Sequence, residues 1–207
     1  MAAERRRSGR QTPLLAVALV AALCGWLQPG AATAALIPAA ARLFAPPVER
    51  STARDAPSKQ PGRYVVYRNQ RFGQTVEYPT DLFTESQDLE DGAGRKFVTA
   101  DGAATLYASG ARNDAGWNVR DLARLSESYF ADKGAEVTFV RTGDNWYVLS
   151  ATDDNGRVHY EKGLVTHQGR IVSTLLVEYP AAWKDYFQPI LSRIVHSFQS
   201  GPAEGVG

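Results

Sequence analysis

Apolar residues recur along the chain in two distinct patterns, one typical of strands and one typical of helices. Short runs of aromatic and β-branched residues predict strands at 64–67, 72–78, 95–100 and 104–110. Asp101-Gly102 separates the last two runs, and this dipeptide favours a tight hairpin turn. A second series, at 136–141, 145–152, 157–167 and 170–179, is divided by short turn sequences and predicts an antiparallel meander.

The segment 118–134 changes to helical spacing, with apolar side chains three and four residues apart. Asn118 is placed to cap the first turn, Asp121 to complete a capping box, and Gly134 to end the helix. The closing segment 181–198 carries a second helical stripe, which Pro189 interrupts. We expect a kink at Pro189 or a new helix that begins there, because an interior proline costs about 3 kcal/mol.

These elements predict an α+β fold. Its centre is an antiparallel sheet of about seven or eight strands, with helices packed on its faces. In chain order we expect four strands, a helix, four strands and a closing helix. The tetrapeptide VEYP occurs at 76–79 and again at 177–180. We interpret both copies as stop signals, because a proline after the strand cannot donate to the ladder.

The first 34 residues have the pattern of an export signal. Four arginines precede an uncharged apolar run over 14–27, and Ala32-Thr33-Ala34 follows. We expect cleavage after Ala34, and hence a periplasmic or secreted protein. Two alternatives remain open: the run 14–27 stays as an uncleaved anchor, or Cys24 carries a lipid.

Composition then divides the remainder of the chain. Residues 35–61 contain five prolines and seven alanines without a sustained period, which predicts a disordered linker. We expect the folded domain at 62–200 and a loose tail at 201–207. As a flexible coil, the linker spans roughly 30 Å.

Composition and charge also exclude several classes of function. Cys24 and Met1 are the chain's single cysteine and methionine, so the processed protein has no thiolate or thioether ligands. From Gly62 onward there are 15 basic and 19 acidic residues, a net charge of −4. An acidic domain gives no electrostatic reason to expect nucleic acid as a partner, or membrane contact other than through the N-terminal segment.

No motif in the sequence marks a catalytic or metal centre, and we expect no cofactor. The histidines His159, His167 and His196 lack metal-ligand spacing, and we expect the strand histidines to face solvent. His159 and Glu161 share one strand face, since they are two residues apart. Paired carboxylates need only spatial proximity, but Glu77, Glu161 and Glu178 are read more simply as residues of polar strand faces.

Aromatic residues provide the remaining candidate for binding. Trp117, Trp146, Tyr147 and Tyr160 are spaced so that several of them can gather at a sheet face or helix edge, where a ligand stacks. The alternative is that most of these rings belong to the core. Trp146 and Tyr147 are neighbours on one strand, so they must point to opposite faces.

The element order, FGQTVEYP near the start, Asn145-Trp146-Tyr147 in the meander and IVHSF at the end together resemble the PsbP-like superfamily. The resemblance covers 64–199. It implies an antiparallel sheet with helices on its faces, in a small non-enzymatic protein that binds or assists a larger assembly. It implies no functional residues here, because the quoted motifs are structural.

Three functional hypotheses follow. The first is an exported, non-catalytic and monomeric domain that binds an envelope protein or a small ligand. The second is a hydrolase, with a cleft of carboxylates or histidine that the sequence does not display. The third is an accessory protein that stabilises a larger complex through an exposed sheet edge or helix face.

Overall fold

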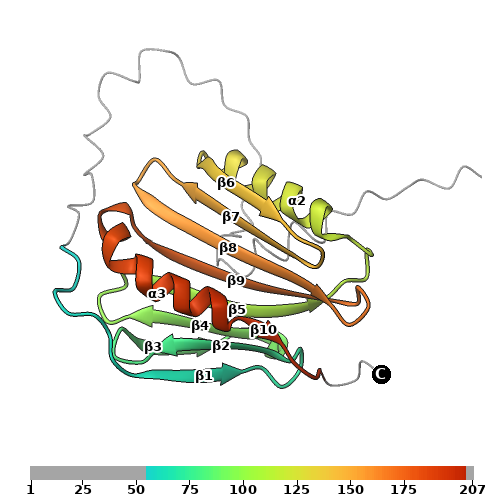
Figure 1. Ribbon diagram of the computed structural model, residues 1–207, viewed down its shortest axis with the longest axis horizontal. Coiled ribbons are helices and arrows are strands. Elements are labelled where there is room, and N and C mark those ends of the chain that lie inside the picture. The colour runs from blue at the N-terminus through green and yellow to red at the C-terminus, as the bar shows by residue number, and fades with distance from the viewer. Residues whose placement is uncertain (1–54, 204–207) are drawn as a thin grey trace, which may run out of the picture.

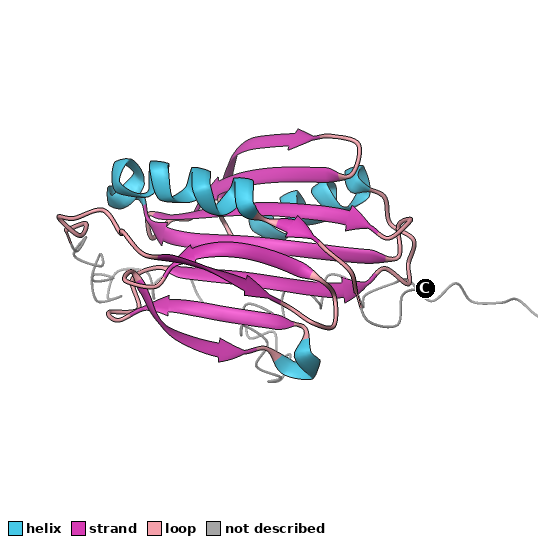
Figure 2. Ribbon diagram, turned by 60° about the horizontal axis from the view of Figure 1, so that its bottom comes forward, coloured by secondary structure: helices cyan, strands magenta, loops and turns pink. Residues whose placement is uncertain are grey.

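The computed structural model describes residues 55–203 (Figure 1). Its strands, in chain order, are β1 (Tyr64–Arg68), β2 (Gln74–Pro79), β3 (Phe83–Asp88), β4 (Gly94–Thr99), β5 (Thr105–Arg112), β6 (Glu136–Thr142), β7 (Trp146–Thr152), β8 (Arg157–Thr166), β9 (Ile171–Pro180) and β10 (Gln199–Ser200). Its helices are α2 (Val119–Asp132) and α3 (Lys184–Ser197), with short 3₁₀ turns at Glu90–Gly92 and Ala181–Trp183. The α+β class predicted from the sequence is confirmed, and Figure 2 shows that strands make up most of the domain.

Seven strands form one antiparallel sheet in the order β3-β4-β5-β9-β8-β7-β6. The predicted meander is confirmed, since β6, β7, β8 and β9 pair consecutively. The strand β9 then pairs with β5, with Leu106 opposite Val177. This pairing joins the two halves of the chain into one sheet, whose outermost strands are β3 and β6.

The sequence predicted a single sheet, but β1, β2 and β10 form a second, three-stranded sheet. Two strands escaped the prediction. In β3 only Phe83 is buried and the next five residues are exposed, so its sequence lacks the alternation of a half-buried strand. The strand β10 has only two residues, too few to leave a pattern.

The main core lies between one face of the large sheet and a layer made of α3 and the small sheet, which lie in front of the sheet in Figure 1. Alternate residues of β4, β5 and β9 supply Phe97, Leu106 and Val177 to this core. Helix α3 supplies Phe187 and Ile194, and both are fully buried. The ring of Phe187 stacks on Tyr179 of β9, with centroids 4.3 Å apart.

The opposite face of the large sheet is covered at its β6 end by α2. Asn118 Oδ1 accepts hydrogen bonds from the amides of Arg120 and Asp121, and Asp121 Oδ2 accepts one from the Asn118 amide. The predicted capping box is therefore confirmed. Gly134 follows the helix at φ 79°, a left-handed conformation that suits glycine.

Helix α3 is continuous through Pro189, so the alternative of a new helix that begins there is wrong. The packing of Phe187 and Ile190, both buried on either side of the proline, compensates for the lost backbone hydrogen bond. Both VEYP copies end strands as predicted, although Pro79 and Pro180 are themselves the last strand residues.

Several predictions lie wholly or partly outside the described residues. They are the signal at 1–34, the cleavage after Ala34, the linker up to residue 54 and the tail from residue 204. Residues 55–61, which were assigned to the linker, contact the domain. Ala56 packs against the main core, and Gln60 Nε2 donates to the carbonyl of Tyr186. Within 55–203, neither helix is long and apolar enough to cross a bilayer.

Candidate functional site

The strand β6 is the edge of the large sheet that exposes apolar side chains. Phe139 is 49% exposed and Val140 is 38% exposed. They are neighbours, so they point to opposite faces of the sheet. Val140 lies opposite Leu149 on the side of α2, and Phe139 lies opposite Ser150 on the other side. Among the described residues, β6 pairs with β7 alone, which leaves its outer backbone groups available.

The two edges of the sheet differ in chemistry. At the opposite edge, β3 exposes Glu85, Gln87 and Asp88, which are polar residues that discourage pairing with another strand. In β6 the register shifts between Val137 and Phe139, so this strand is bulged in its first half. The regular part of the β6 edge is therefore 139–142, and its exposed apolar residues are Phe139 and Val140.

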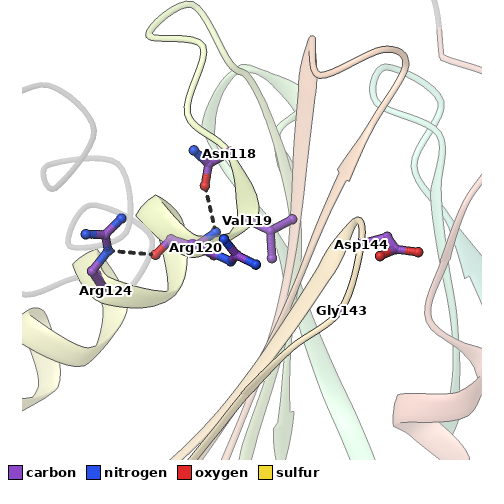
Figure 3. Close-up of a pocket in the computed structure, with 6 residues that line it drawn as sticks. All are labelled: Asn118, Val119, Arg120, Arg124, Gly143 and Asp144. Atoms are coloured by element: carbon purple, nitrogen blue, oxygen red, sulfur yellow. Dashed lines mark hydrogen bonds between the residues drawn. The ribbon is translucent and has the colours of Figure 1, made fainter.

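A pocket of about 420 Å³ lies at the end of this regular part, between the first turn of α2 and the hairpin that joins β6 to β7 (Figure 3). It is lined by Asn118, Val119, Arg120, Arg124, Gly143 and Asp144. Gly143 is required where it stands, because a Cβ atom there would overlap the indole of Trp146. The hairpin can therefore fold closely over the tryptophan ring beside the pocket.

Two guanidinium groups give the pocket its basic character. Arg124 donates from Nη2 to Asp121 Oδ1 over 2.9 Å. The guanidinium of Arg120 has no hydrogen-bond or ion-pair partner within 55–203, and in Figure 3 the Asp144 carboxylate points away from the helix. The helix amides are already capped by Asn118, so a ligand would meet side chains rather than the helix terminus. The pocket can receive a carboxylate or another small anion.

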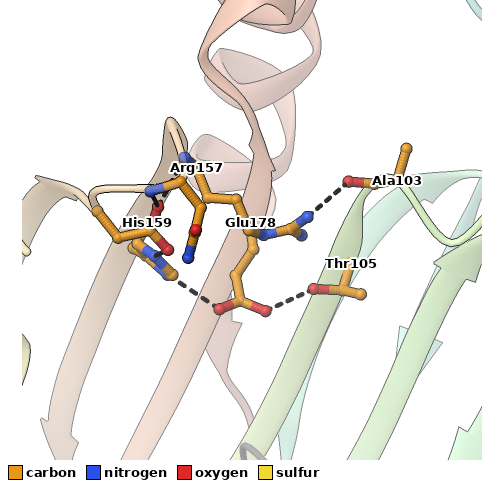
Figure 4. Close-up of polar contacts among 7 residues, drawn as sticks. Ala103, Thr105, Arg157, His159 and Glu178 are labelled. Atoms are coloured by element: carbon orange, nitrogen blue, oxygen red, sulfur yellow. Dashed lines mark hydrogen bonds and ion pairs between the residues drawn. The ribbon is translucent and has the colours of Figure 1, made fainter. Parts of the chain in front are cut away.

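A second polar cluster, centred on His159, lies within the fold (Figure 4). Nδ1 of His159 lies 2.9 Å from Glu178 Oε1, and Nε2 lies 3.2 Å from Asp153 Oδ2. The other oxygen of Glu178 accepts a hydrogen bond from Thr105 Oγ1 over 2.8 Å. The imidazole of His159 also packs on the ring of Phe130, with centroids 5.3 Å apart.

The charges in this cluster stabilise one another. Burial alone would lower the pKa of His159, but hydrogen bonds with Glu178 and Asp153, and their negative charges, raise it above 6.5. Burial alone would raise the pKa of Glu178, but hydrogen bonds from His159 and Thr105 hold it below 4.5. Because each ring nitrogen is hydrogen-bonded to a carboxylate, neither nitrogen is placed to act as a base on a substrate.

Glu161 is fully buried beneath α2. Ser126 Oγ donates to its Oε1 over 2.6 Å, and the Tyr147 hydroxyl donates to the same oxygen. The second oxygen, Oε2, has no partner among the described residues. Burial raises the pKa of Glu161 above 4.5 despite the two hydrogen bonds. Burial and the neighbouring carboxyl raise the pKa of Tyr147 well above 10.

These observations correct two sequence-based expectations. His159 does not face solvent, because α2 and the β-turn before β8 enclose it, and its side chain is only 13% exposed. Glu161 and Glu178 are not exposed residues of a polar strand face either. Glu161 is 0% exposed, and the side chain of Glu178 is 18% exposed. By contrast, His196 is exposed, and Glu77 forms a surface ion pair with Arg193 at 2.9 Å. That His159 and Glu161 share one face is confirmed by their register.

The four aromatic residues proposed as a ligand cluster do not come together. Trp146 packs against the main core, whereas Tyr147 packs under α2 on the opposite face. Tyr160 lies opposite Ser150, four pairs along the ladder from Trp146. Trp117 is tied to the loop before α2, where its amide donates to Asn113 Oδ1. Ligand binding by any of these rings stays a prediction.

No family model and no curated protein matches the sequence, but several solved structures match the fold. The solution structure of cyanobacterial PsbP (CyanoP) from Synechocystis sp. PCC 6803 aligns with a TM-score of 0.53 at 16% identity. The alignment covers 71% of this chain and 98% of CyanoP. The chain has a PsbP-like fold. The resemblance predicted from the sequence is thereby confirmed at the level of fold.

Two structures of Mog1 also align with the PsbP-like domain. A mutant of the protein Mog1 has a TM-score of 0.51 at 8% identity, with coverage of 70% of this chain and 100% of Mog1. The Ran-binding protein Mog1p of Saccharomyces cerevisiae has a TM-score of 0.47 at 10% identity, with coverage of 67% and 95%. At these identities the likeness concerns the fold alone.

Sequence reasoning missed Phe139, Val140, Arg120 and Arg124 as candidate site residues. A signal for the β6 edge was present. The predicted meander begins at 136–141, and the first strand of a meander is paired on one side only unless another segment covers it. Two adjacent apolar residues in that strand could have been recognised as exposed on this ground. The pocket leaves no such signal, because it depends on where α2 packs.

Proposed function

We propose that this chain is an exported accessory protein, and that its PsbP-like domain binds a protein partner and performs no catalysis. The observation that carries the proposal is the regular edge of β6, with Phe139 and Val140 exposed beside a basic pocket. Soluble domains usually protect such edges, and an unprotected one is a template for pairing with another chain.

Three further features support this function. The predicted signal at 1–34 would direct the chain out of the cytoplasm, and the predicted linker would hold the domain away from its N-terminal attachment. The fold is shared with CyanoP. Both ring nitrogens of His159 are used in internal contacts, so His159 serves the stability of the sheet.

The hydrolase hypothesis draws on one observation, the buried pair of His159 and Glu178 with the Thr105 hydroxyl nearby. In a catalytic triad the second imidazole nitrogen faces the nucleophile, but here it faces Asp153. The geometry therefore favours a binding domain. A screen of the purified full chain on ester, phosphoester and glycoside substrates, with His159→Gln as the control, tests this reading. Turnover that is lost in the variant would contradict it.

Co-purification from the organism's own cells tests partner binding. The full chain carries a C-terminal affinity tag, and the comparison includes Phe139→Glu and Val66→Glu. Val66 is the matched control, because it is 60% exposed and lies on β1, an edge strand of the small sheet. We expect one partner to accompany the wild type and Val66→Glu and to be lost with Phe139→Glu. A partner that is retained by Phe139→Glu would place the interface elsewhere.

A further inference from the structure

The exposed edge of β6 and the basic pocket at its end are adjacent along the chain, which restricts what can bind there. β6 ends at Thr142, and Gly143, the next residue, lines the pocket. Any strand that pairs with 139–142 therefore reaches the mouth of the pocket within one or two residues. Occupation of the edge and of the pocket by one ligand requires an extended backbone.

We propose that the β6 edge takes up an extended segment of the partner protein as an additional antiparallel strand, with an acidic side chain of that segment bound at Arg120. This inference rests on the proposed function and adds the chemistry of the partner. Strand addition supplies backbone hydrogen bonds, and the side chains on either face supply specificity.

Register and face fix where the acidic residue must lie. The pocket is on the α2 side of the sheet, and Val140 and Thr142 both face that side, as their partners Leu149 and Tyr147 show. In an antiparallel pair, directly opposite residues share a face. The residue of the added strand opposite Thr142 therefore points toward Arg120, and the residue opposite Val140 comes two positions later. The expected sequence is an acidic residue, any residue, then two apolar residues.

Charge complementarity favours an acidic segment over a basic one. From Gly62 onward the chain has a net charge of −4, yet the pocket lining has two arginines, Arg120 and Arg124, against one carboxylate, Asp144. Arg124 is compensated by Asp121, whereas Arg120 has no compensating carboxylate within 55–203. The edge of β1 also exposes apolar side chains, Val65 and Val66, and serves as the comparison site.

Fluorescence anisotropy with labelled ten-residue peptides tests this proposal on the full chain. The probe peptide contains glutamate, threonine, valine and valine in succession, flanked by serine and glycine. A second peptide has lysine in place of the glutamate. A third has proline in place of the valine that would lie opposite Val140, which removes a backbone donor. We expect saturable binding of the glutamate peptide in the micromolar range and much weaker binding of the proline peptide.

Variants on the protein complete the experiment. Phe139→Glu should weaken binding of the glutamate peptide at least tenfold, while Val66→Glu should leave it unchanged. Arg120→Glu should weaken that peptide about fivefold, as expected for a surface ion pair, and should favour the lysine peptide by a similar factor. All three substituted side chains are exposed, and circular dichroism of each variant confirms that the fold is retained.

Three results would overturn the proposal. The glutamate and lysine peptides could bind the wild type equally, the proline peptide could bind as well as its parent, or the chain alone could dimerise through β6 in sedimentation experiments. These outcomes are separate from a failure of the proposed function. If a partner is lost with Phe139→Glu but peptides of this chemistry do not bind, protein binding stands and strand addition is wrong.

Discussion

Individual residues in this domain show how burial decides whether a polar side chain stabilises or destabilises the fold. Glu161 and His159 look alike in the sequence, as polar residues on one face of β8. In the structure, His159 is held between two carboxylates, whereas one oxygen of Glu161 has no partner within 55–203. The first residue therefore stabilises the fold through charge, and the second costs stability when it ionises.

Replacement of Glu161 with glutamine should reduce the pH dependence of stability. Burial raises the folded-state pKa of Glu161 above the ordinary value of 4.5, so the wild type loses stability as pH rises above 4.5 toward the folded-state pKa. Glutamine can still accept hydrogen bonds from Ser126 and Tyr147 but does not ionise. Urea denaturation should show that the free energy of unfolding of Glu161→Gln, relative to that of the wild type, is higher at pH 8 than at pH 5.

Glu127→Gln is the control for this experiment, because Glu127 is exposed on the same helix that covers Glu161. Its stability relative to the wild type should be the same at both pH values. Equal behaviour of Glu161→Gln and Glu127→Gln would show that Glu161 is not the buried acid described here.

Replacement of His159 with glutamine should destabilise the domain by about 2 kcal/mol near pH 6. Glutamine carries no charge and cannot reach both Glu178 and Asp153. The raised pKa of His159 means that its contribution is complete below pH 6.5 and is lost as pH rises through the folded-state pKa. The lowered pKa of Glu178 means that its contribution is present above 4.5 and is lost as pH falls through the folded-state value.

Denaturation curves from pH 3 to pH 9 measure this difference. The gap in unfolding free energy between wild type and His159→Gln should be widest near pH 5 to 6 and should narrow on both sides. His196→Gln, at an exposed position, should follow the wild type throughout. A gap that does not vary with pH would mean that His159 acts by packing on Phe130 alone.

At the scale of elements, the sequence predicts those segments whose local chemistry decides their structure. The capping box at Asn118 identified α2, and the turn residues between strands identified the meander. The strand β3 could not be predicted, because its exposed residues carry no alternation and its pairing with β4 decides its conformation. The same holds for Pro189, where packing of α3 on the sheet overrides the local cost of proline.

The pairing of β7 with β8 depends on a glycine. Gly163 lies opposite Tyr147, and a Cβ atom at this position would overlap the tyrosine ring. Gly163→Ala should therefore displace the ring that holds Glu161 and destabilise the domain by about 2 kcal/mol, as overpacking does. Gly62→Ala is the control, because a Cβ atom there would meet only Asp81 at 4.0 Å. Thermal unfolding of both variants checks the prediction, and an equal effect would contradict it.

At the scale of the whole molecule, the sequence predicted the α+β class and the PsbP-like fold but not the layers of that fold. The small sheet joins β1 and β2 to β10, which comes from the other end of the described sequence, a contact that no local pattern encodes. For the candidate site, the sequence likewise indicated chemical types but not positions in space. The four aromatic residues were selected by chemical type, and only the opposite orientation of Trp146 and Tyr147 followed from the strand pattern. Exposure of Phe139 follows from the place of β6 at the edge of the sheet, which the sequence indicated only through its position as the first strand of the meander.

Site-specific photo-crosslinking in the producing cells tests the central claim most directly, that the domain binds a protein partner at β6. A benzophenone amino acid replaces Phe139 in one version of the full chain and Val66 in another, so that each probe stands on an exposed edge strand. We expect irradiation to give one discrete adduct of higher mass from position 139 and none from position 66. Absence of an adduct at position 139, or the same adduct from both positions, would contradict the account.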